Sequence, residues 1–291
     1  MPSVANGYIE RTYVCQDNLT LYYRDYGLHN TDRTALLCLP GLTRNSKDFH
    51  ELALRYAGER RVVCPDFRGR GRSEYDPKWR RYNARVLLAD VQQLLAATNL
   101  HKVVVVGTSL GGLLAMGLAV AEPRVLAGVV LNDVGPDIDY DGLGQIVDWV
   151  SRDRPQPDFE TAARYLKQHA SRIGVRSDEG WLKLACNTWH KGADGRLHFD
   201  YDLNLVRPVA ELVESCGAGR MDLWPMFRAL YPIPTTLLRG ENSDLLSRDS
   251  VSRMIQVKPD LHFVEVAGAG HVPQLDEPES LEAIDALLAR I

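Results

Sequence analysis

The sequence has few of the features that mark membrane proteins, secreted disulfide-rich proteins or zinc proteins. No apolar run approaches the length of a membrane-spanning helix, and no basic segment followed by an apolar one opens the chain, so neither a membrane span nor a signal peptide is expected. The five cysteines are odd in number and include no Cys-x-x-Cys pair, which argues against a disulfide framework and a metal site. We therefore expect a cytoplasmic protein without a bound metal.

Excess basic charge is also missing. The 291 residues carry a formal net charge of −4, and 45% hydrophobic with 25% charged residues is typical of a soluble globular protein. Nothing in this balance favours binding to nucleic acid or to an anionic membrane. One local exception is a basic stretch, for which we expect a solvated face; it contains Arg70, Arg72, Lys78, Arg80, Arg81 and Arg85.

Strand-like and helix-like segments alternate along two parts of the chain. Residues 8–14 and 19–26 read as an antiparallel hairpin at a sheet edge. Apolar runs at 35–39, 61–65, 103–106, 125–131, 235–239 and 261–266 then alternate with helical patterns, which predicts an α/β fold with a mostly parallel sheet and helices on both faces. Between 136 and 219 only broken helical fragments appear. We predict a core of residues 1–135 and 220–291, with a helical cap at 136–219.

The stretch 103–119 is the first part of the sequence that indicates a catalytic function. A run of four valines is followed by Gly107-Thr-Ser109-Leu-Gly111 and then by a helical pattern. The order strand, G-x-S-x-G, helix is that of a nucleophile elbow, in which a tight turn exposes a serine hydroxyl. The spacing predicts that Ser109 is a nucleophile.

A serine hydroxyl needs a general base and an acid that orients the base. His271 is the expected base, because it follows the last strand in a glycine-rich loop at the edge where open α/β sheets carry their sites. Asp244, after the preceding strand, is the expected acid, since the order serine, aspartate, histidine suits it. Asp133 ends the strand that follows the elbow helix, and it remains an alternative acid.

An oxyanion site needs two preorganised N–H donors. We expect the backbone N–H of Leu110, next to the nucleophile, and that of Leu42, in the loop after the 35–39 strand. Arg44 could touch a polar group of the substrate. Four tryptophans in or beside the cap could either line an apolar pocket or pack the cap onto the sheet; they are Trp149, Trp181, Trp189 and Trp224.

With these motifs in place, the chain resembles α/β-hydrolase fold proteins of the capped esterase and lipase-like type. Segments 39–42, 66–73, 107–112, 240–244 and 270–271 match that family's motifs in order and spacing. The resemblance implies an eight-stranded sheet, a lid inserted after the sixth strand, and the roles of nucleophile, acid and base for Ser109, Asp244 and His271. Relatives that place an aspartate at the elbow, such as haloalkane dehalogenases and epoxide hydrolases, are excluded by Ser109.

The predicted function is a cofactor-free serine hydrolase that cleaves carboxylic esters or lactones through an acyl-enzyme on Ser109. The acyl groups are expected to be small to medium in size and apolar or aromatic. Two alternatives stay open: a carbon–carbon bond hydrolase or cofactor-free lyase on the same scaffold, and a non-catalytic ligand receptor. The expected partner is a small ester or related carbonyl compound, and the sequence carries no signal of an oligomeric state.

Overall fold

The computed structural model describes residues 7–170, 173–216 and 220–291. Its central sheet has eight strands in the order β1-β2-β4-β3-β5-β6-β11-β12. β2 is antiparallel to both of its neighbours and the other pairs are parallel, which confirms the predicted α/β sheet with an edge hairpin. The bounds are β1 (Ile9–Val14), β2 (Thr20–Tyr26), β3 (Ala35–Leu39), β4 (Val62–Pro65), β5 (Val103–Thr108), β6 (Leu126–Asn132), β11 (Thr235–Gly240) and β12 (His262–Val266).

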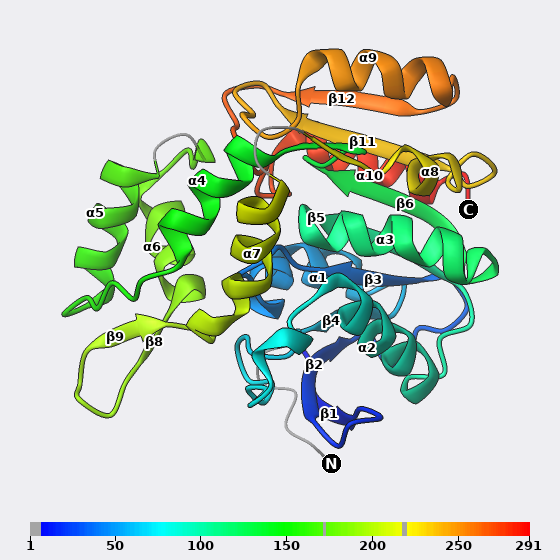
Figure 1. Ribbon diagram of the computed structural model, residues 1–291. Coiled ribbons are helices and arrows are strands. Elements are labelled where there is room, and N and C mark those ends of the chain that lie inside the picture. The colour runs from blue at the N-terminus through cyan, green and yellow to red at the C-terminus, as the bar shows by residue number, and fades with distance from the viewer. Residues whose placement is uncertain (1–6, 171–172, 217–219) are drawn as a thin grey trace.

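Helices cover both faces of this sheet (Figure 1). On one face, α1 (His50–Ala57) and α10 (Pro278–Leu288) share a hydrophobic cluster with alternate residues of the central strands. The other face is covered by α2 (Ala84–Ala97), α3 (Leu110–Ala121), α8 (Trp224–Arg228) and α9 (Arg248–Val257). Short 3-10 helices connect several of these elements, at Ser46–Phe49, Trp79–Arg81, Pro123–Val125 and Leu203–Val206.

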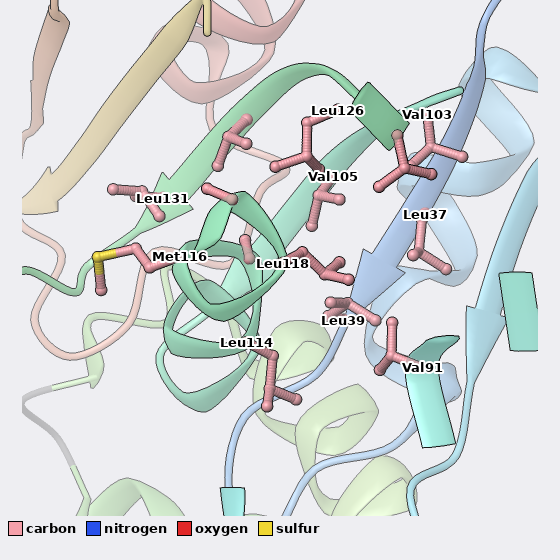
Figure 2. Close-up of a cluster of buried hydrophobic side chains, with 14 of the residues drawn as sticks. Leu37, Leu39, Val91, Val103, Val105, Leu114, Met116, Leu118, Leu126 and Leu131 are labelled. Carbon is pink, nitrogen blue, oxygen red and sulfur yellow. The ribbon is translucent and has the colours of Figure 1, made fainter. Parts of the chain in front are cut away.

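Helix α3 lies against the middle of the sheet. Figure 2 shows Leu114, Met116 and Leu118 of α3 among side chains of β3, β5 and β6, such as Leu37 and Val105. The central strands are buried on both faces, which is why their sequences are continuous apolar runs instead of alternating ones. This packing fixes the start of α3, and with it Ser109, relative to the sheet.

Between β6 and β11, the elements from β7 to β10 form a separate layer, as Figure 1 shows for α4–α7. These elements surround a hydrophobic cluster of their own, which includes Leu166, Trp181 and Trp189. Helix α7 and the short antiparallel strand pairs were not expected from the sequence. The elements are β7 (Asp137–Asp139), α4 (Tyr140–Val150), α5 (Phe159–His169), α6 (Asp178–Thr188), β8 (Trp189–Lys191), β9 (Leu197–Phe199), α7 (Arg207–Cys216) and β10 (Arg220–Asp222).

Candidate active site

Ser109 is the turn residue between β5 and α3. Its backbone has φ 50° and ψ −111°, a conformation that residues with side chains rarely adopt, and its N–H donates to the Asn132 carbonyl at 3.0 Å. Glycines make the turn feasible: a Cβ on Gly107 would lie 2.6 Å from the Gly111 backbone, and one on Gly111 would lie 2.0 Å from the Leu39 carbonyl oxygen. The serine hydroxyl therefore stands at the tip of a tight strand-to-helix turn.

His271 follows β12 and lies beside Ser109. Its Nε2 atom is 3.2 Å from Ser109 Oγ, and its Nδ1 atom is 2.7 Å from Oδ2 of Asp133. Strands β5, β6 and β12 are parallel, so the residues that follow them meet at one edge of the sheet. Hydroxyl, imidazole and carboxylate form one hydrogen-bonded line, in which Nε2 can accept the serine proton while Nδ1–H donates to the carboxylate.

The carboxylate of Asp133 is fully buried and held by three donors. Its Oδ1 accepts from the Gly240 N–H at 3.0 Å, and its Oδ2 accepts from the Ser243 hydroxyl at 2.7 Å as well as from His271. A buried carboxylate without such partners would be costly, because burial removes its hydration. The three donors therefore fix both the position and the orientation of Asp133.

The Nδ1 atom of His271 contacts Asp133, whereas Asp244 was the acid predicted first. A neutral imidazole carries a single N–H, and at Nδ1 that group faces Asp133, the alternative acid. Asp244 is exposed in the loop after β11, where its neighbour Ser243 bonds to Asp133. β6 and β11 are adjacent parallel strands, so both aspartates end up at the same sheet edge, and motif order alone does not separate them.

The predicted oxyanion residues flank Ser109 from two sides. Leu110 is the first residue of α3, a position whose N–H has no intrahelical acceptor. Gly41, in the loop after β3, approaches the serine so closely that a Cβ there would lie 3.9 Å from the Ser109 Cβ. The next residue, Leu42, also lines the cavity in front of Ser109, and in the described chain its N–H donates to no protein acceptor.

A cavity of about 520 Å³ lies in front of Ser109 and His271. Its walls are largely apolar, and many of them come from the layer between β6 and β11. Trp149 of α4 lines the cavity, whereas Trp181 and Trp189 belong to that layer's own core and Trp224 packs beneath the sheet. Both interpretations of the tryptophans therefore apply, each to different residues. Apolar walls include Ile138, Ile146, Leu166, Ile173 and Leu212.

Arg44 also lines the cavity, but its charge is already paired. Its Nε and Nη2 atoms donate to the two carboxylate oxygens of Asp48, both at 2.7 Å, and Nη1 donates to the Thr188 hydroxyl at 2.6 Å. The bond to Thr188 ties the loop after β3 to α6, while the bidentate pair with Asp48 balances the charge of the guanidinium. A contact between Arg44 and a substrate stays a prediction.

Two arginines of the loop after β4, Arg68 and Arg70, are in opposite situations. Arg68 is buried and forms ion pairs with Asp17, Asp76 and Asp90. Arg70 does not lie on the expected solvated face, because its side chain is 0% exposed and lines the cavity. The expectation of a solvated face does hold for the exposed residues Arg72, Lys78, Arg80 and Arg85.

Within residues 7–170, 173–216 and 220–291, no group of three or more His, Cys, Asp or Glu side chains is arranged to hold a metal ion. Over the same residues, no helix combines the length and apolar character needed to cross a bilayer.

Comparison with known proteins identifies the family to which this fold belongs. A model of the alpha/beta hydrolase family matches residues 36–284, and the chain belongs to this family of enzymes. It is 34% identical over 265 residues to a 3-hydroxybutyrate-oligomer hydrolase of Cupriavidus necator, a match that covers 89% of each chain. It is 27% identical to a 2-(acetamidomethylene)succinate hydrolase of Mesorhizobium japonicum, over 86% of each chain.

A solved structure gives the same assignment. The crystal structure of an alpha/beta hydrolase from Novosphingobium aromaticivorans superposes with a TM-score of 0.91 at 40% sequence identity. The match covers 98% of this chain and 99% of the other. The fold of the chain is therefore a known architecture of this family.

Proposed function

We propose that the protein is a serine esterase that cleaves small to medium carboxylic esters through an acyl-enzyme on Ser109. The observation that carries this proposal is the hydrogen-bonded line from Ser109 Oγ through His271 to Asp133, with distances of 3.2 and 2.7 Å. Membership of the alpha/beta hydrolase family supports the reaction class. Asp133 replaces Asp244 as the proposed acid.

In the first half-reaction, Ser109 Oγ attacks the ester carbonyl carbon while His271 Nε2 takes the hydroxyl proton. The carbonyl π electrons move onto the oxygen, and the N–H groups of Leu42 and Leu110 stabilise the resulting oxyanion. When the tetrahedral intermediate collapses, the bond to the alcohol oxygen breaks and His271 gives its proton to that oxygen. The alcohol leaves, and the acyl group stays on Ser109.

In the second half-reaction, water attacks the acyl carbon. His271 removes one proton from the water and returns it to Ser109 Oγ as the carboxylic acid leaves. Asp133 keeps the imidazole in the tautomer with Nδ1–H and stabilises the imidazolium formed in each half-reaction. Each proton is thereby accounted for by side chains and water.

We propose that the layer between β6 and β11, residues 136–219, acts as a cap that selects the substrate. Its apolar walls and a volume of about 520 Å³ suit compact aliphatic or aromatic groups. The 3-hydroxybutyrate-oligomer hydrolase relative makes short oligomers of 3-hydroxybutyrate the first compounds to assay, after a general ester such as p-nitrophenyl butyrate.

The test combines turnover with active-site labelling. Wild-type protein should hydrolyse p-nitrophenyl butyrate and react with a fluorophosphonate probe at Ser109. The Ser109→Ala variant should lose both, with turnover down by about 10⁴-fold or more and an unchanged circular dichroism spectrum. Labelling of Ser109 without turnover of any ester would favour a ligand receptor, and undiminished turnover by the variant would refute the proposal.

A further inference from the structure

Arg70 has hydrogen-bonding capacity that the protein does not use. Its side chain is 0% exposed and lines the same cavity as Ser109. Nε donates to the Leu42 carbonyl at 2.8 Å and Nη1 donates to the Arg68 carbonyl at 2.7 Å, while Nη2 is buried without a hydrogen-bond partner. A guanidinium has five N–H donors, and these two bonds leave three of them for another acceptor.

The charge of Arg70 is likewise unpaired. In the described chain, Arg68 has three carboxylate partners and Arg44 has Asp48, but Arg70 forms no ion pair. The negative charge of Asp202 raises the pKa of Arg70. However, the Asp202 carboxylate accepts its hydrogen bond from the Tyr82 hydroxyl, at 2.7 Å. Arg70 instead has the ring of Tyr82 beside it, with its Cζ atom 5.8 Å from the ring centroid.

Burial without a counter-ion is costly for a guanidinium. It lowers the pKa of Arg70 from the usual 12.5 to about 10, so the side chain is still protonated at pH 7. Two carbonyl oxygens offset part of the lost hydration. The remaining donors and the whole positive charge would be matched by an anion that enters the cavity, and a carboxylate is the anion that fits a planar guanidinium best.

We propose that Arg70 binds a free carboxylate of the substrate, and that the site therefore prefers esters that carry such a group. This inference rests on the proposed esterase function, because it uses the same cavity. Linear oligomers of a hydroxy acid have the required chemistry, since each has cleavable ester bonds and one terminal carboxylate. Arg70 is thereby a specificity-determining residue, distinct from the acid, base and nucleophile.

The hydrogen bond from Arg70 Nε to the Leu42 carbonyl suggests a different role for Arg70. Arg70 could serve only to position Leu42, whose N–H belongs to the proposed oxyanion site. Loss of a positioning residue would lower kcat for charged and neutral esters alike, because both need the oxyanion site. Loss of a carboxylate-binding residue would raise KM for the charged ester alone.

The experiment compares two substrates that differ only in charge: the linear dimer of 3-hydroxybutyrate, and the same dimer with its carboxylate converted to a primary amide. For wild-type protein we expect kcat/KM to be about 10- to 100-fold higher for the acid, mainly through KM, as for one charge-assisted hydrogen-bonded pair. Arg70→Gln should abolish this preference while the amide dimer is cleaved within about threefold of the wild-type rate, since its side-chain amide can still donate to Leu42.

Two controls separate the outcomes. Arg176→Gln removes a charge from a cavity residue whose side chain is 51% exposed, and it should affect both dimers equally because water screens that charge. For a readout that needs no variant, 3-hydroxybutyrate should inhibit wild-type hydrolysis of p-nitrophenyl butyrate competitively, and 3-hydroxybutyramide should not. This inhibition assay tests whether the cavity binds a carboxylate even if Arg70→Gln does not fold.

An equal loss for both dimers in Arg70→Gln would overturn the proposal in favour of a positioning role. So would a wild-type enzyme that does not favour the acid, or equal inhibition by acid and amide. These results would leave the esterase function standing as long as p-nitrophenyl butyrate is cleaved in a Ser109-dependent manner. Loss of the esterase function itself would show separately, in the Ser109→Ala comparison.

Discussion

Exchange of a single oxygen for an NH₂ group at residue 133 tests which aspartate orients the base. In Asp133→Asn, the side-chain oxygen will remain opposite the Gly240 N–H, because an NH₂ group there would face another donor. The NH₂ group then takes the place of Oδ2, toward His271 and the Ser243 hydroxyl. Ser243 can rotate its hydroxyl so that its oxygen accepts a hydrogen bond from this NH₂ group. The Nδ1 atom of His271 also faces the NH₂ group, and it can accept only if it carries no hydrogen.

That change moves the imidazole proton to Nε2, the atom that should accept the proton of Ser109. The serine is then left without a base. We expect kcat to fall by about 10³- to 10⁴-fold, since the wrong imidazole tautomer has an effect of this size in serine hydrolases. In activation free energy the loss corresponds to about 4–5.5 kcal/mol.

The assay measures kcat and KM for p-nitrophenyl butyrate, and the Asp244→Asn variant is the matched control. Asp244→Asn makes the same chemical change in the loop after β11, and it should stay within about threefold of wild-type kcat because Asp133 keeps the imidazole tautomer. Thermal unfolding checks that both variants are folded. A large loss in Asp244→Asn together with an active Asp133→Asn would refute the assignment of Asp133.

Two further predictions concern stability. Gly111→Ala should prevent folding or strongly lower Tm, because its Cβ would lie 2.0 Å from the Leu39 carbonyl oxygen, whereas Gly58→Ala, with no atom within 4 Å of its Cβ, should be tolerated; equal Tm values would contradict this. Arg68→Met should lower the free energy of unfolding by about 3–5 kcal/mol in urea titrations, because it leaves buried carboxylates unpaired. The exposed pair of Arg33 and Glu59 supplies the control, and Arg33→Met should change stability little; similar losses in the two arginine variants would refute the argument.

The sheet and the tight turn at Ser109 could be predicted from the sequence because their signals are local. A buried parallel strand must be apolar along its whole length, and the turn at Ser109 leaves no room for a Cβ at Gly107 or Gly111. His271 was predictable too, since it follows a strand in a glycine-rich loop. The layer between β6 and β11 was predicted only in outline, because helix α7 and the short strand pairs lack such strong local patterns.

The acid and the buried arginine could not be settled in this way, because both depend on long-range packing. Asp133 and Asp244 follow neighbouring parallel strands, so both reach the same edge, and only the three-dimensional register brings Asp133 to the imidazole. Arg70 looked like one of several surface arginines in a glycine-rich loop. Its burial arises from the segment around Tyr201, far along the chain, which pairs with it in an isolated β-bridge.

In the proposed reaction, an ester transfers its acyl group to Ser109. Mass spectrometry of wild-type protein quenched in acid during turnover of p-nitrophenyl butyrate tests it most directly. Peptide mapping should find one butyryl group on the peptide that contains Ser109, and none on that peptide in Ser109→Ala. Rapid, Ser109-independent release of p-nitrophenol, or a butyryl group on a different residue that turns over at the catalytic rate, would contradict the account.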